Sequence, residues 1–158
     1  MNGIDPQLVF TPAEVATLTR LSNLVIPPSE DGTLPGAGEF DVAGYIATAA
    51  PDSIAALRDE LAELSARAAT ELGKPISDVT AVEFEDLVGQ LRGASPRFLS
   101  GFAKQTVSLY YQQDAVLEAI GLEARAPYPI GFDVKPGDLS LLDPVRQRGR
   151  IYRETNGA

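Results

Sequence analysis

The chain has 158 residues, of which 44% are hydrophobic, and a formal net charge of −9 at pH 7. This length and hydrophobic content predict one domain with a proper core and exclude global disorder. Because the chain contains neither His nor Cys, it excludes a Ser-His-Asp triad, a Cys-His pair, thiolate or imidazole metal sites, and disulfides.

The acidic charge also narrows the class of partner. A strongly negative protein is repelled by nucleic acid and by anionic membrane surfaces, so we expect no nucleic-acid partner. No stretch approaches the roughly 20 consecutive apolar residues that span a bilayer, so we expect no direct membrane insertion. Residues 1–6 lack the basic region and apolar segment of an export signal. This favours a cytoplasmic location, whereas a periplasmic one requires a removed signal or export bound to a partner.

The first predicted helix begins at Pro12. Thr11 is a natural N-cap, Glu14 completes a capping box, and Phe10 before the cap fits a hydrophobic staple. The helix ends before Pro27, because the residue that precedes a proline avoids helical geometry.

Apolar periodicity and turn signals predict further helices between Pro27 and Gly121. A loop rich in Gly and Pro covers 29–38 and a short helix covers 41–49. The longest helix runs over 54–72 and ends at Gly73. Thr80 and Glu83 repeat the capping box before the next helix. The remaining helices are expected over 81–92, 96–111 and 114–120.

These helices predict an all-α fold, an irregular bundle of five to six helices over residues 1–121. No stretch has the pattern of a strand. Apolar residues recur at helical spacing and identify the faces expected to line the core. They are Val15, Leu18, Leu21 or Ser22, Val25, Val42, Tyr45, Ile46, Ile54, Leu57, Leu61, Leu64, Ala68, Leu72, Phe84, Leu87, Val88, Leu91, Phe98, Leu99, Phe102 and Leu109, with Thr106 on the same face.

Residues 122–158 are predicted to form a second region, a long extended tail rich in Pro and Gly. The tail holds turn-formers and aromatic side chains in place of a helical pattern. Its apolar residues are too many for a free arm, so we expect it to pack on the chain's own helices or on a partner subunit. Its charge is +1, whereas residues 1–121 carry −10. This difference in charge is compatible with packing on the chain's own acidic helices and with packing on a partner subunit.

Carboxylates are the remaining candidates for catalysis or metal binding. Asp59, Glu60 and Glu63 lie within about one helical turn of each other, and the same is true of Glu83, Glu85 and Asp86. A carboxylate enzyme that uses Glu83 or Asp86 is one alternative, but a solvated helix face explains both groups better. The loop acids Glu30, Asp31, Glu39 and Asp41 lack the spacing of a calcium-binding EF-hand. We therefore expect no catalytic, cofactor-binding or metal-binding residue.

Tyr110 and Tyr111 are neighbours near the end of a predicted helix. Adjacent helical residues point about 100° apart, so one ring is expected inside and the other toward the tail or a partner. Tyrosine suits an interface because it joins an apolar body to a polar tip.

Two groups of motifs together resemble the gluconate 2-dehydrogenase subunit 3 family. The first runs from Leu21-Ser22-Asn23-Leu24-Val25-Ile26-Pro27-Pro28 through Pro35-Gly36-Ala37-Gly38 to Val42-Ala43-Gly44-Tyr45-Ile46. The second contains Tyr110-Tyr111, Asp114-Ala115-Val116, Ile120-Gly121, Pro127-Tyr128-Pro129, Gly131-Phe132, Leu142-Asp143-Pro144-Val145-Arg146 and Ile151-Tyr152-Arg153. The resemblance covers nearly the whole chain and is strongest at its two ends.

The resemblance implies a non-catalytic small subunit that binds and stabilises a large FAD-dependent dehydrogenase, and that helps it to fold or mature. The large subunit is of the glucose–methanol–choline type, holds the FAD, and oxidises a sugar, glycoside or alcohol; some such complexes add a cytochrome c subunit. The alternative is a self-contained helical structural or regulatory protein without a flavoprotein partner. The residues expected to bind the partner are Ile26, Pro27, Tyr110, Tyr111, Tyr128, Phe132, Leu142, Arg146, Tyr152 and Arg153.

Overall fold

The protein is all-α in the part of the chain that its structure, a computed structural model, describes: residues 9–126, 128–131 and 134–149. No strand occurs in these ranges, which confirms the predicted fold class. By its internal contacts the chain divides into two units, a body up to residue 125 and a second unit from residue 126 onward. None of the described helices is long and apolar enough to cross a membrane.

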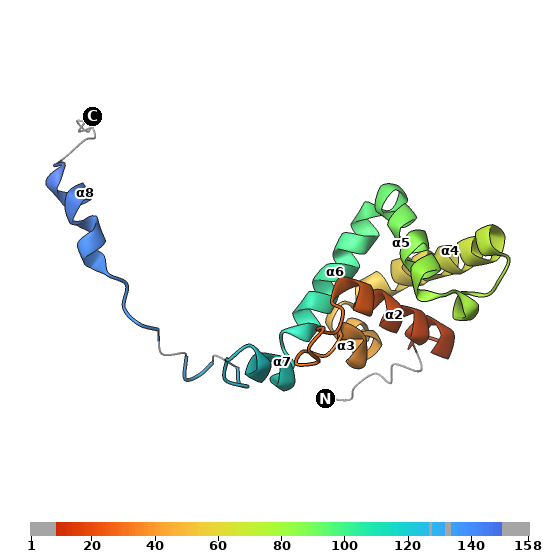
Figure 1. Ribbon diagram of the computed structural model, residues 1–158, viewed down its shortest axis with the longest axis horizontal. Coiled ribbons are helices and arrows are strands. Elements are labelled where there is room, and N and C mark those ends of the chain that lie inside the picture. The colour runs from red at the N-terminus through yellow and green to blue at the C-terminus, as the bar shows by residue number, and fades with distance from the viewer. Residues whose placement is uncertain (1–8, 127, 132–133, 150–158) are drawn as a thin grey trace. The chain divides into compact units, whose positions relative to one another are not determined.

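The body helices lie at steep angles to one another, as an irregular bundle does (Figure 1). Short 3-10 turns, η1 (Ala37–Glu39), η2 (Pro51–Ser53) and η3 (Ile76–Asp78), join several of them. The helices are α2 (Pro12–Val25), α3 (Val42–Ala49), α4 (Ile54–Leu72), α5 (Ala81–Ala94), α6 (Pro96–Tyr110) and α7 (Asp114–Ala119). Each corresponds to a helix that the sequence predicts.

Both predicted capping boxes are present. At the start of α2, the Thr11 hydroxyl accepts from the Glu14 amide at 3.3 Å, and the Glu14 carboxylate accepts from the Thr11 amide. Thr80 and Glu83 form the same reciprocal pair at the start of α5. These bonds satisfy amide groups that a helix N-terminus otherwise leaves without a partner.

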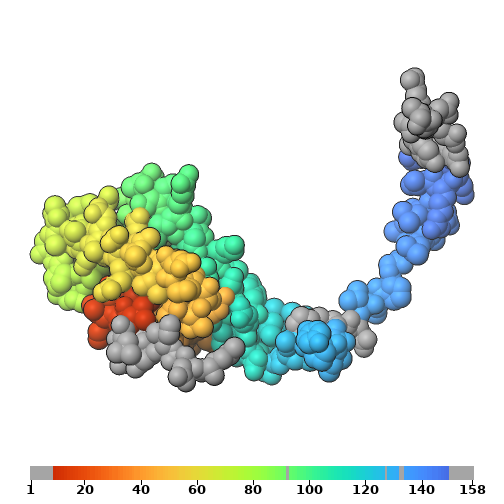
Figure 2. All heavy atoms as spheres, turned by 180° about the vertical axis from the view of Figure 1, so that it is seen from behind, coloured from red at the N-terminus to blue at the C-terminus, as the bar shows by residue number. Residues whose placement is uncertain are grey.

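One large hydrophobic core contains side chains from all five helices α2, α3, α4, α5 and α6, and the predicted inward faces line it. In the space-filling view, α3 (orange) and α4 (yellow) pack closely beside one another in the body (Figure 2). Phe10, before the first capping box, is 1% exposed and belongs to this core. The buried predicted residues are Leu18, Leu21, Ser22, Val42, Ile46, Leu57, Leu61, Leu64, Ala68, Phe84, Leu87, Val88, Leu91, Phe102, Thr106 and Leu109. The other predicted residues are only partly buried and pack against this core: Val15, Val25, Tyr45, Ile54, Leu72, Phe98 and Leu99.

Arg20 ties α2 to the segment that leads into α5, a role that the sequence does not indicate. Its guanidinium lies 4.0 Å from the centroid of the Phe84 ring. The same group donates to the carbonyl oxygens of Ile76, Val79 and Thr80 at 2.9, 2.8 and 3.1 Å. A planar guanidinium with five N–H donors suits this combination of ring and carbonyl contacts.

The second unit contains a helix where the sequence predicts turns, so that part of the tail prediction was wrong. A 3-10 turn, η4 (Leu139–Leu142), leads directly into α8 (Asp143–Gln147). The Asp138 carboxylate accepts from the amide and the hydroxyl of Ser140, at 3.0 and 2.6 Å, and so caps η4. Pro144 lies in the first turn of α8, where its missing N–H costs nothing.

Candidate partner-binding surface

The loop between α2 and α3 is fastened to the end of α2. The side-chain oxygen of Asn23 accepts from the Gly38 amide at 2.8 Å. The Ile26 carbonyl accepts from the Ala37 amide at 2.9 Å. These two bonds hold the Pro35-Gly36-Ala37-Gly38 segment flat against the helix.

Both glycines of this segment lie close to other parts of the chain. A Cβ atom added to Gly38 would lie 2.6 Å from the Thr19 carbonyl oxygen and 2.7 Å from the Asn23 amide nitrogen. One added to Gly36 would lie 2.4 Å from the Asn23 side-chain oxygen. Real Cβ atoms do not come this near to other heavy atoms. A side chain at Gly38 would therefore push the loop away from the α2 backbone, whereas one at Gly36 would displace the Asn23 side chain.

The fastened loop, the end of α6 and α7 converge in a second, smaller cluster. The Tyr110 hydroxyl donates to the Pro35 carbonyl oxygen at 2.9 Å. The rings of Tyr110 and Phe40 meet edge to face, with centroids 5.8 Å apart. We call this the loop–Tyr110 cluster; its buried members are Ala37, Tyr110 and Val116, and its half-buried members are Ile26, Leu34 and Phe40.

Tyr110 and Tyr111 occupy opposite environments, as their helical offset predicts. Tyr110 is 2% exposed, whereas Tyr111 is 51% exposed. Their rings are nearly perpendicular, with centroids 5.3 Å apart. Burial raises the pKa of Tyr110, and the charges of Tyr111 and Glu39 raise it further. Tyr110 is therefore a core residue, and the Tyr111 ring beside it is half exposed.

The other predicted contact residues of the body lie next to this cluster. Ile26 is half-buried within it, and Pro27 is exposed immediately after it. The structure thus brings Ile26 and Tyr110 together, and the sequence places Pro27 and Tyr111 directly beside them. These four predicted residues therefore lie in or directly beside the loop–Tyr110 cluster.

The second unit exposes its apolar side chains. Tyr128 is 87% exposed and Leu142 is 45% exposed. Arg146 pairs with Asp143 one turn earlier at 3.1 Å, and both side chains are exposed, so this pair adds little stability. Phe132, Tyr152 and Arg153 lie outside the described residues. The sequence-based selection missed other exposed apolar residues of the unit: Ile130, Val134, Leu139, Leu141 and Val145.

Several of the acids considered for catalysis or metal binding serve the backbone or form ion pairs. The Glu83 carboxylate contacts the Lys74 ammonium at 2.7 Å; with the Thr80 bonds, this lowers the pKa of Glu83 to about 2. Asp31 accepts from Ser29 and Thr33 within its own loop, and these bonds lower its pKa to about 2. Nowhere in the described ranges do three or more acids gather as a metal site would require.

The fold and the surface define an all-helical protein with a fastened loop and an exposed apolar segment. The chain belongs to the gluconate 2-dehydrogenase subunit 3 family, whose model matches residues 12–124. The match spans α2 to α7 and ends where the body ends, so the tail motifs named above lie outside it. The family is by description one of dehydrogenase subunits. Comparison with curated proteins and with solved structures found no match.

Proposed function

We propose that the chain is a non-catalytic accessory subunit that binds and stabilises a large FAD-dependent dehydrogenase acting on a sugar, glycoside or alcohol. One observation carries the proposal beyond family membership. In the second unit Tyr128, Ile130 and Val134 are each more than 80% exposed. A segment with this much apolar surface in water is stabilised by a partner that covers it.

The free energy available from such covering is substantial. Full burial of one large aliphatic or aromatic side chain contributes roughly 1.5–3 kcal/mol. The described part of the second unit exposes several such side chains. Their burial must exceed the free-energy cost of ordering the segment on the partner. We therefore expect this short segment to form a specific interface with the partner.

The proposal assigns the cofactor to the partner. Three acids that could be drawn into a catalytic or metal site already have structural partners. The Glu83 carboxylate caps α5 and pairs with Lys74, Asp31 accepts from Thr33 within a turn, and Asp41 caps α3. The FAD then belongs to the large subunit, of the glucose–methanol–choline type. A cytochrome c subunit that takes the electrons fits the same arrangement.

Co-expression tests the proposal. The tagged full chain is produced together with a large flavoprotein of this type from the same organism, and FAD absorbance is measured in the purified complex. We expect a flavin-containing complex, and a flavoprotein that is inactivated by heat more slowly than when it is produced alone. A chain that purifies without flavin, beside a flavoprotein of unchanged yield and thermal stability, would contradict the proposal and leave a self-contained helical protein.

A further inference from the structure

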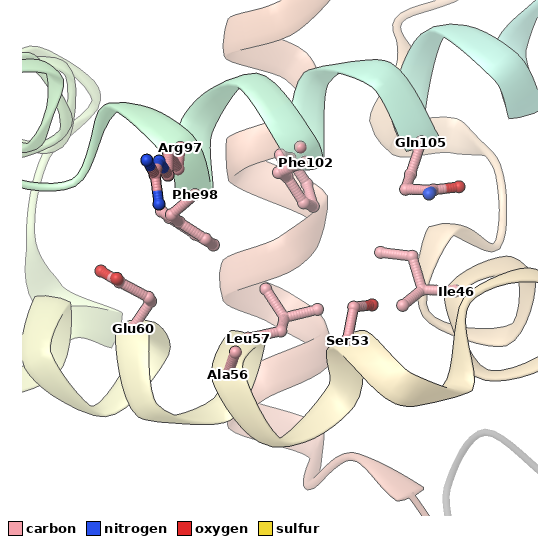
Figure 3. A pocket seen from close by; sticks show the side chains of 10 residues that line it. Ile46, Ser53, Ala56, Leu57, Glu60, Arg97, Phe98, Phe102 and Gln105 are labelled. Atoms are coloured by element: carbon pink, nitrogen blue, oxygen red, sulfur yellow. The ribbon is translucent and has the colours of Figure 1, made fainter.

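We draw no further inference here: the strongest candidate, the groove between α4 and α6 that Leu57 and Phe102 line (Figure 3), is an open surface cleft, and nothing in the structure shows what covers it.

Discussion

The Tyr110 hydroxyl donates to the Pro35 carbonyl oxygen at 2.9 Å, and so joins the end of α6 to a loop 75 residues earlier in the chain. Tyr110→Phe removes this bond and leaves the carbonyl without that donor, so we expect a loss of about 1 kcal/mol in the free energy of unfolding. Urea unfolding followed by circular dichroism measures it. Tyr111→Phe is the control, because that ring is half exposed; equal losses in both variants would contradict the role given to Tyr110.

Gly38 is expected to tolerate no side chain. In Gly38→Ala the new Cβ lies 2.6 Å from the Thr19 backbone oxygen, so the loop must move away from α2. We expect a loss of roughly 1–3 kcal/mol, the usual range for overpacking. Gly93→Ala, which meets open space in α5, is expected to raise stability by up to about 1 kcal/mol. Thermal unfolding of both variants gives the comparison, and a neutral Gly38→Ala would contradict the close approach.

Glu83 makes part of the stability depend on pH. Its pKa is lowered from 4.5 to about 2, first by the Lys74 bond and then by the Thr80 bonds. A group with a lowered pKa in the folded chain contributes stability above its unfolded pKa, and this is lost as the pH falls through the folded value. We expect Glu83→Gln to be less stable than the unmodified chain at pH 7 and the difference to shrink toward pH 2. Urea unfolding across this range checks it; a constant difference would exclude the ionised carboxylate as its source.

Deletion of residues 126–158 separates the roles of the two units. The body has its own core, so we expect the shortened chain to keep its helical circular dichroism and to unfold cooperatively. Under the proposed function it loses affinity for the flavoprotein, because the exposed apolar side chains of the second unit are gone. Pull-down with FAD absorbance measures that loss. Loss of the fold without the second unit would instead favour the self-contained alternative.

The helices were predictable because their signals are local. Thr11 with Glu14 and Thr80 with Glu83 form their bonds within one turn, so sequence spacing alone identifies them. The apolar periodicity of α4, α5 and α6 is equally local, and it selected the correct buried faces. By contrast, α8 has only five residues, too few for a periodic pattern to be recognised.

The contacts that shape the candidate surface were less predictable because they join distant segments. Sequence indicated that one of Tyr110 and Tyr111 lies inside, but which one depends on where the Pro35 loop reaches α6. Likewise, the three carbonyl groups that receive Arg20 come together only after α2 and α5 have packed. The contacts of Phe132, Tyr152 and Arg153 stay predictions, since these residues lie outside the described ranges.

The separation between Pro35 and Tyr110 has a consequence for the order of folding during synthesis. A ribosome releases the fastened loop long before Tyr110 and Val116, and closing so long a stretch of chain is entropically costly until the intervening helices have packed. Ile26, Leu34 and Phe40 therefore lack the Tyr110 and Val116 side chains of their cluster until those residues have been synthesised. The loop–Tyr110 cluster is therefore completed only after Val116 has been synthesised.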